Sequence, residues 1–398
     1  MTAFGSRGDI QPLLALGLRM RDQGYRVTIA AAPNYRRWIE NLGFRFAGVG
    51  GDFGPWLKQQ DTKNPFVLLK SLAGYIRRET PLCFAQTLQV VRGADLVVTT
   101  THIASQSAAE LAGVPCRTVL PTVQMLPSGH YPPMGFPWQG LPTKLNRLLW
   151  QAMDLLFNRM LKGPVNSERA KLGMGPIRSF LSYMRGARPI VTADQAFMDI
   201  PSDVSSGPIQ TGSLTLPAKG DLEPDMETFL NGGDPPIYIG FGSMVDRTPE
   251  KTTKIILDAI RLSGQRAILC AGWADLALPS ASAMVLMIRE APHALLFPRV
   301  AVVVYHGGAG TTAAALRAGV PQIVVPHLGD QFFHARRVYE LGIGPKPIPR
   351  SKLNARRLAE AINAVLGMPE MRRKAEALAD EVRRIDGVAL TIEALLTG

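Results

Sequence analysis

The chain has 398 residues, of which 46% are hydrophobic and 19% charged, a profile typical of a globular protein with two domains of ordinary size. Its formal net charge is +12. The basic residues form short doublets with acids nearby and no stripe interleaved with aromatic residues, so we do not expect a nucleic-acid-binding protein. The charge leaves open a loose association with an anionic membrane surface.

The start of the chain and its cysteines bear on the compartment. No apolar segment is as long as a membrane span, and Met1 is followed almost at once by a glycine turn, so we expect neither a membrane helix nor a signal peptide. The three cysteines, Cys83, Cys116 and Cys270, show no pairing or metal-ligand spacing. This usage is typical of a reducing compartment, and we expect a cytoplasmic protein.

The N-terminal stretch alternates strands and helices. A short strand ends in the turn Gly5-Ser6-Arg7-Gly8-Asp9, which places Asp9 at the mouth of a parallel sheet, where α/β proteins bind ligands. From the residues alone, Asp9 is either a helix-capping carboxylate or part of a ligand site. The expected elements that follow, which form one Rossmann-like half, are a helix over 12–23, a strand over 25–32, a helix over 34–42 and a strand over 44–49.

The region between residues 53 and 142 is rich in aromatic, proline and methionine residues in segments expected to be loops. Such a composition predicts a broad apolar pocket with few polar anchors, although each aromatic residue taken singly also fits the core. His102, which follows a strand expected over 95–101, is a pocket residue or a rival catalytic base. The other candidates for this pocket are Phe53, Trp56, Thr122, Gln124, Met125 and Tyr131.

A turn-rich stretch over 193–224 divides the chain. We interpret it as the linker between an N-terminal domain, residues 1–207, and a C-terminal domain, residues 208–398. The second domain opens with a strand that ends in another glycine turn, at Gly242 and Ser243, before a helix expected over 249–263.

Residues 302–312 have the pattern of a phosphate site. A buried strand, 302–305, runs into His306 and a glycine-rich turn that opens an Ala-rich helix. Gly308 and Gly310 let the backbone approach an anion, and the free N–H groups and positive dipole end of the helix attract it. The side chains that can add hydrogen bonds to this anion are those of His306, Thr311 and Thr312.

A second unit repeats this pattern, with a strand over 322–326 and a polar turn before a helix over 332–341. The turn holds Asp330 and Gln331, whose carboxylate and amide can bind neighbouring hydroxyls. Phosphate beside polyol points to a nucleotide sugar. A rival interpretation is the dinucleotide fingerprint G-x-G-x-x-A over 308–313 with Asp330 on a ribose, but this turn comes late in the chain and His306 faces the phosphate position.

The run 292–349 resembles the nucleotide-sugar motif of family 1 glycosyltransferases, in the branch that contains sterol 3-beta-glucosyltransferases and bacterial enzymes acting on terpenoids, polyketides and glycopeptides. Residues 5–12 resemble the N-terminal motif of the same branch, with a shorter first strand before it. The resemblance implies a GT-B fold, in which two Rossmann-like domains face each other across a cleft. It also implies that the last helix, about 387–398, packs back on the N-terminal domain.

The resemblance further implies an inverting, metal-independent transfer of a hexose, in the first place glucose, from a UDP-sugar to an apolar acceptor such as a sterol, triterpenoid, flavonoid or polyketide. Asp9 would be the base, Gly242 and Ser243 would lie over the donor phosphates, and His306 would stabilise the leaving diphosphate. Apart from the UDP-sugar no cofactor is expected. A TDP-sugar donor, a nucleotide-sugar epimerase, a non-catalytic binding protein and the oligomeric state stay open.

Overall fold

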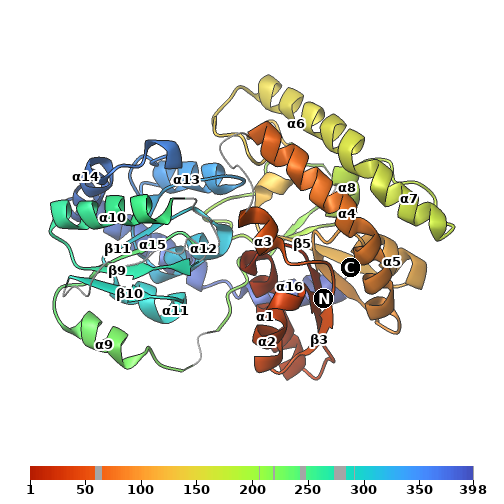
Figure 1. Cartoon of the computed structure of the whole chain (residues 1–398), viewed down its shortest axis with the longest axis horizontal. Coiled ribbons are helices and arrows are strands. Elements are labelled where there is room, and N and C mark those ends of the chain that lie inside the picture. The colour runs from red at the N-terminus through yellow and green to blue at the C-terminus, as the bar shows by residue number, and fades with distance from the viewer. Residues whose placement is uncertain are drawn as a thin grey trace.

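The computed structural model describes residues 1–58, 65–205, 207–217, 220–242, 248–272, 284–290 and 292–397. The chain forms two lobes that lie side by side, each built on a parallel β-sheet with helices packed around it (Figure 1). The expected α/β class with two Rossmann-like domains is therefore confirmed. Ser243, predicted to lie over the donor phosphates, is outside the described residues.

The first lobe contains a seven-stranded sheet in the order β3-β2-β1-β4-β5-β6-β7. The central strand β1 has only two residues, but both are buried and pair with strands on either side. Because β7 belongs to this sheet, the first lobe extends past the boundary expected after residue 207. The strands are β1 Thr2–Ala3, β2 Thr28–Ala31, β3 Arg45–Gly48, β4 Val97–Thr100, β5 Cys116–Leu120, β6 Ile190–Val191 and β7 Ile209–Gln210.

Two helices of the first lobe differ from expectation. α1 begins at Arg7 and keeps Pro12 inside it, because a cap formed by Ser6 and Asp9 starts the helix before the proline. The expected aromatic loop after Asp52 is a short helix, α3, with the Asp52 carboxylate accepting from the Gly54 N–H at its start. The helices are α1 Arg7–Asp22, α2 Arg36–Asn41, α3 Phe53–Lys58, α4 Pro65–Val91, α5 Ser105–Ala112, α6 Thr143–Phe157, α7 Gly163–Lys171 and α8 Phe180–Arg185, with 3-10 turns at Pro33–Tyr35 and Val123–Met125 and a π-helical turn at Asn158–Lys162.

The second lobe contains a five-stranded parallel sheet in the order β10-β9-β8-β11-β12. The neighbours β8 and β11 are fully buried, and their carboxyl ends carry the two glycine turns side by side. The elements are β8 Ile237–Gly240, β9 Ala267–Cys270, β10 Val285–Ile288, β11 Val302–Tyr305, β12 Gln322–Val324, α9 Pro224–Asn231, α10 Pro249–Ser263, α11 His293–Leu296, α12 Ala309–Ala318, α13 Gln331–Glu340, α14 Ala355–Leu366, α15 Pro369–Arg383 and α16 Gly387–Leu396, with 3-10 turns at Phe297–Arg299 and Arg350–Lys352.

The last helix returns to the first lobe, where both chain ends lie in Figure 1. Ile392 and Leu395 of α16 are buried in the core formed by α1 and its sheet, and Arg19 pairs with Asp386 at 3.0 Å. Between the lobes, an apolar core is continuous, with Tyr131 packed edge-on against Phe333 at 5.2 Å between ring centroids. Within the described residues, none of the helices is long and apolar enough to span a bilayer.

Candidate active site

Asp9 is held by the residues just before it. Its Oδ2 accepts hydrogen bonds from the backbone N–H of Ser6 at 2.7 Å and from the Ser6 hydroxyl at 3.0 Å. Gly5, at a φ of +128°, leaves room for this arrangement, because a Cβ at this position would lie 2.5 Å from the same oxygen. Both bonds from Ser6 reach Oδ2, so Oδ1 is the oxygen best placed to meet a substrate.

The environment of Asp9 makes it a stronger base than an ordinary aspartate. Burial raises the pKa of the Asp9 carboxyl to about 6, the bonds from Ser6 oppose the rise, and the negative charge of Asp330 adds to it. Asp330 belongs to the other lobe, so the second lobe contributes to the electrostatic environment of Asp9. A carboxylate with a pKa near 6 can accept a proton close to neutral pH.

His102, the rival candidate for the catalytic base, is buried and poorly suited to that role. Its Nδ1 accepts from the Ala104 N–H at 3.3 Å and lies 3.1 Å from the Ser105 hydroxyl. Because a backbone N–H only donates, the ring proton belongs on Nε2. Burial lowers the pKa of His102 to about 4, so the ring is neutral.

Aromatic rings gather beside the Asp9 turn. Phe53 and Trp56 of α3 lie 4.9 Å apart, and Tyr75 of α4 lies 5.1 Å from Trp56, as measured between ring centroids. Phe4, at the end of β1, contacts both Phe53 and His102. The structure thus brings Phe53, Trp56 and His102 together, and it adds Phe4 and Tyr75.

The turn at the start of α12 is open toward solvent. Its cap is Gly308, which has no side chain to satisfy the helix, and the backbone N–H groups of Ala309, Gly310 and Thr311 have no partner within it. Gly310 is exposed, with no atom within 4 Å of the position a Cβ would take. This end of α12 can hold an anion with its N–H groups and its dipole.

His306 lies between the two glycine turns of the second lobe. A Cβ at Gly242, where φ is +58°, would lie 2.8 Å from the ring, and a Cβ at Gly308 would collide with Nε2. Burial, together with a smaller effect of nearby histidines, lowers the pKa of His306 to about 3, so the imidazole is neutral. Its Nδ1 is buried and has no partner among the described residues. A neutral imidazole can still donate one hydrogen bond to a phosphate oxygen.

Two side chains predicted to bind the sugar nucleotide, those of Thr312 and Gln331, also make hydrogen bonds within the protein. Thr312 is buried, donates to the Gly308 carbonyl at 3.0 Å and lies 2.8 Å from the Tyr305 hydroxyl. The Gln331 Oε1 accepts from the backbone N–H groups of His327 at 2.8 Å and Leu328 at 3.1 Å, which fixes the polar turn. Thr311 and Asp330 are only half-buried and remain available to a donor.

α13 also fixes the glycine turn. His334, fully buried on this helix, donates from Nδ1 to the Gly307 carbonyl at 2.8 Å. Gly307 has a φ of +97° and would bring a Cβ within 2.9 Å of Val324. The helix that presents Asp330 therefore also holds the turn that presents His306.

The remaining acceptor candidates line the contact between the lobes. Tyr131 donates to the Val123 carbonyl at 2.7 Å, and Gln124 donates to the Pro132 carbonyl at 3.0 Å. Thr122 accepts from the Gln124 N–H and caps a 3-10 turn, while Met125 packs against the shared core. Thr122, Gln124 and Tyr131 are buried, and their bonds hold the segment that follows β5.

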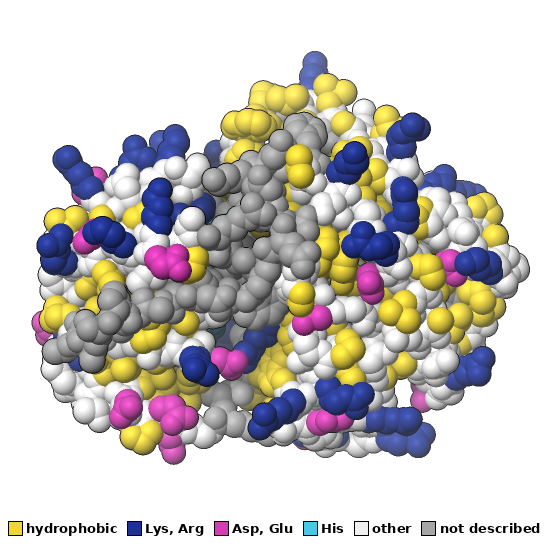
Figure 2. Space-filling model, in the orientation of Figure 1, with side chains coloured by type: hydrophobic (Ala, Val, Ile, Leu, Met, Phe, Trp, Pro, Cys, Tyr) yellow, Lys and Arg dark blue, Asp and Glu magenta, His cyan; other side chains and the backbone are white. Residues whose placement is uncertain are grey.

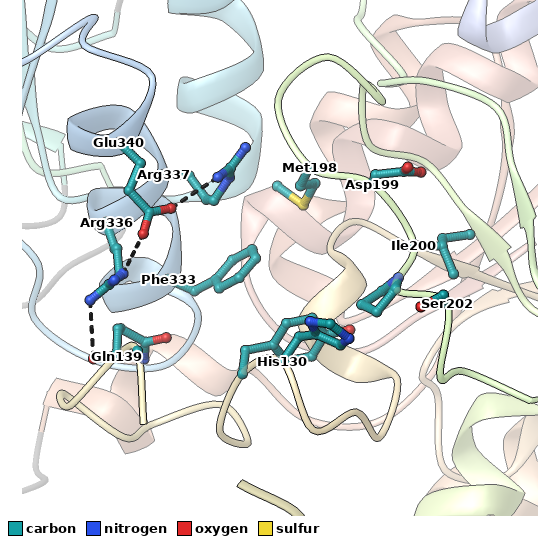
Figure 3. A pocket seen from close by; sticks show the side chains of 13 residues that line it. His130, Gln139, Met198, Asp199, Ile200, Ser202, Phe333, Arg336, Arg337 and Glu340 are labelled. Carbon is teal, nitrogen blue, oxygen red and sulfur yellow. Dashed lines mark hydrogen bonds and ion pairs between the residues drawn. The ribbon is translucent and has the colours of Figure 1, made fainter. Parts of the chain in front are cut away.

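A cavity of about 560 Å³ lies between the lobes at this contact. In Figure 3, Phe333 of α13 points across it toward Met198 and His130, while Arg336 and Arg337 pair with Glu340 on the same helix. Tyr131 lines this cavity, but Asp9 and His306 do not. The cavity therefore belongs to the contact between the lobes and is not lined by Asp9 or His306.

Sequence reasoning missed the groups that shape the base. Ser6 stands three residues before Asp9, the spacing of a capping box, and this signal was present in the sequence. Phe4 and Tyr75 had no such signal, since they meet only in the folded lobe. Among the described residues, no group of three or more His, Cys, Asp or Glu side chains is arranged to hold a metal ion.

Two family models match the chain. Residues 1–114 match the glycosyltransferase family 28 N-terminal domain, and residues 276–384 match the C-terminal domain of erythromycin biosynthesis protein CIII-like proteins. The chain is 35% identical to the vancomycin aglycone glucosyltransferase of Amycolatopsis orientalis, over 100% of this chain and 96% of that one. It is 33% identical to the dTDP-epi-vancosaminyltransferase of the same organism, over 94% and 91%.

A plant relative and a solved structure complete the comparison. The chain is 31% identical to a sterol 3-beta-glucosyltransferase of Arabidopsis thaliana, over 98% of this chain and 66% of that one. The crystal structure of the kitacinnamycin glycotransferase superposes with a TM-score of 0.71 at 18% identity, over 99% and 96% of the two chains. The chain therefore belongs to the GT-B glycosyltransferases, in the group that holds bacterial natural-product enzymes and sterol 3-beta-glucosyltransferases, and it is a glycosyltransferase.

Proposed function

We propose that this enzyme transfers a hexose from a UDP-sugar to a hydroxyl of an apolar small molecule, with glucose as the first candidate for the hexose. The transfer inverts the anomeric carbon and needs no metal ion. The observation that carries the proposal is a division of labour between the lobes. One lobe supplies Asp9 with its raised pKa, and the other supplies an uncapped helix N-terminus beside the neutral His306.

Asp9 takes the proton of the acceptor hydroxyl. As this O–H bond breaks, the hydroxyl oxygen bonds to the anomeric carbon, and the bond from that carbon to the diphosphate oxygen breaks. Attack from the face opposite the leaving group turns an alpha-linked donor into a beta-glycoside. The other products are the nucleoside diphosphate and protonated Asp9, which returns its proton to water.

The leaving diphosphate needs compensation for its growing negative charge. The backbone N–H groups at the start of α12 and one N–H of His306 are fixed before the reaction, so they can stabilise this charge without rearranging. Fixed dipoles of this kind can take the place of the metal ion that other transferases use. Asp330, half-buried beside the same turn, is our candidate for the sugar hydroxyls.

The acceptor proposal rests on the aromatic cluster, Phe4, Phe53, Trp56 and Tyr75, which adjoins the Asp9 turn. Flat apolar rings fit a fused-ring or polycyclic acceptor. The names of the relatives, a vancomycin aglycone glucosyltransferase and a sterol 3-beta-glucosyltransferase, support this size and character. We propose a sterol, triterpenoid, flavonoid or polyketide.

A TDP-sugar is the second candidate donor, and the relative named dTDP-epi-vancosaminyltransferase favours it. We also propose a cytoplasmic location, because Cys83, Cys116 and Cys270 are all free thiols.

The test is release of nucleoside diphosphate from UDP-glucose and TDP-glucose with a panel of sterol, triterpenoid, flavonoid and macrolide acceptors, in the presence of EDTA. The wild type is compared with Asp9→Asn and with Asp22→Asn, an exposed carboxylate at the other end of α1. Acceptor-dependent release that survives the chelator and is lost only in Asp9→Asn is expected. Donor turnover without an acceptor would indicate an epimerase, and nucleotide binding without turnover a binding protein.

A further inference from the structure

Helix α6 packs one face into the lobe and carries leucines on the opposite face. One face packs inward, where Asn146 and Trp150 are buried. At 100° per residue, a second row falls on the far side of the helix and points away from the lobe. We call this row the leucine stripe; its exposed members are Leu145, Leu148, Ala152, Leu155 and Leu156.

The stripe is too exposed to be an edge of the core. Leu148 is 60% exposed and Leu155 is 71% exposed, so neither side chain is covered by the lobe. Figure 2 shows apolar side chains at the upper edge of the right-hand lobe, over α6, with Lys and Arg side chains around them. A contiguous apolar row on a surface helix marks an interaction site.

The charges around the stripe are of one sign. Residues 143–162 contain Lys144, Arg147, Arg159 and Lys162, and Asp154 is their only acid. Asp154 is occupied inside the lobe, since Ser179 donates to one of its oxygens at 2.7 Å and Asn158 to the other at 2.9 Å. Arg147 pairs with Asp203 at 3.5 Å, so Lys144, Arg159 and Lys162 supply the net positive charge that flanks the leucines.

From these observations we propose that the leucine stripe docks this enzyme on the surface of an anionic phospholipid bilayer. Leucines on a helix lying flat in the interface bury apolar area among the acyl chains, while flanking Lys and Arg meet lipid phosphates. A second copy of the chain is a poorer occupant. In a two-fold antiparallel pair of α6 helices, Lys144 and Arg147 would face Arg159 and Lys162 of the copy, with no free acid between them.

The docked face is coupled to the aromatic cluster through α4. Arg77 of α4 donates to the carbonyl of Met160, in the π-helical turn that follows α6, and Tyr75 on α4 belongs to the cluster. A docked enzyme would thus hold its acceptor pocket on the lobe that touches the bilayer, the source of an apolar acceptor. This last consequence rests on the proposed function, whereas the docking itself does not.

The test is co-sedimentation of the full chain with extruded vesicles, with no sugar nucleotide or acceptor present. One set is phosphatidylcholine alone, and the other contains phosphatidylglycerol at one part in four. Leu148→Gln/Leu155→Gln removes the stripe without adding charge, and Lys144→Gln/Arg159→Gln removes flanking charge. Leu111→Gln/Leu262→Gln, at exposed leucines on α5 and α10, is the matched control.

We expect the wild type and the control to bind anionic vesicles and to bind phosphatidylcholine far less. Each stripe or charge variant should bind about tenfold more weakly, and salt should weaken the wild type. The proposal is overturned if the wild type ignores anionic vesicles, or if both α6 variants bind as well as the control. It is also overturned if the wild type sediments as a dimer that the stripe variant dissociates. With a water-soluble acceptor, the acceptor-dependent release of nucleoside diphosphate should be equal in all variants. This assay separates failure of docking from failure of the reaction.

Discussion

Each lobe contains a buried strand that runs through a glycine turn into a helix, and the two turns treat the helix N-terminus in opposite ways. In the first lobe, the start of α1 is closed by its own carboxylate, since Asp9 accepts two bonds from Ser6. In the second lobe, the start of α12 has only Gly308 as its cap and stays open. The turn of the first lobe thus contains a carboxylate, whereas the turn of the second lobe has none and can bind an anion from a ligand.

The difference teaches how one fold can supply both halves of a transfer reaction. A carboxylate built into the first turn is partly desolvated, and burial raises the pKa of Asp9 toward that of a useful base. An N-terminus without a carboxylate keeps its dipole and N–H groups for a diphosphate.

The largest effect is expected for Asp9→Asn. The amide oxygen can still accept from Ser6, so the turn survives, but the base is lost and turnover should fall roughly two to four powers of ten in nucleotide-release assays. Burial raises the pKa of the carboxyl from 3.8 to about 6. Ionisation of Asp9 above pH 6 therefore lowers the free energy of unfolding of the wild type. The variant should therefore melt no lower than the wild type at pH 8; near-normal turnover would place the base elsewhere.

Closing the open turn should have the next largest effect. Gly310→Asp puts a carboxylate in the first turn of α12, at an exposed position with free space around it. The carboxylate interacts favourably with the helix dipole and repels the diphosphate of the donor. The donor KM should rise on the order of tenfold, with an unchanged or higher melting temperature. Gly310→Ala, which also adds a side chain but no charge, is the control and should bind the donor nearly as well as the wild type.

The coupling between the two carboxylates should appear in the pH profile. Since Asp9 must be ionised to act, kcat/KM should rise with pH below about 6 and level off above it. The charge of Asp330 helps to raise this pKa, so Asp330→Asn should move the rising limb to lower pH, whatever it does to the absolute rate. A limb that stays in place would mean that the two groups are not neighbours in the working enzyme.

The smallest effect is expected for Ser6→Ala. It removes the hydroxyl bond to Asp9 but keeps the shorter backbone bond. Because that hydroxyl bond holds the pKa of Asp9 down, its loss should move the limb slightly to higher pH and lower the rate at pH 6 by a few-fold. Ser6→Thr should restore the wild-type pH profile. A profile unchanged in both variants would show that the Ser6 hydroxyl does not influence the pKa of Asp9.

Sequence reasoning placed the second lobe more closely than the first. The strand 302–305 and the helix 249–263 coincide with β11 and α10, because an all-buried apolar run and a Pro-to-Gly helix are local signals. α1 was expected to start at Pro12, yet it starts five residues earlier. The Ser6 and Asp9 cap, a signal present in the sequence, decides where the helix starts, and Pro12 is accommodated inside it.

Other features were beyond a linear pattern. Neighbouring Thr311 and Thr312 look equivalent in sequence, but a helix turns them 100° apart, and only Thr312 faces the core. Gln331 stays a prediction for the sugar, and the structure adds that its side-chain oxygen accepts from backbone N–H groups of its own turn. The aromatic cluster joins a strand end, α3 and α4, so only the folded lobe reveals it.

The most direct test of the division between the lobes is the affinity of UDP for Asp9→Asn and Gly310→Asp, measured side by side with the wild type by titration calorimetry. If one lobe supplies the base and the other binds the diphosphate, Asp9→Asn binds UDP at least as tightly as the wild type, and Gly310→Asp binds on the order of tenfold more weakly. Equal losses in both variants, or wild-type affinity in Gly310→Asp, would contradict the account.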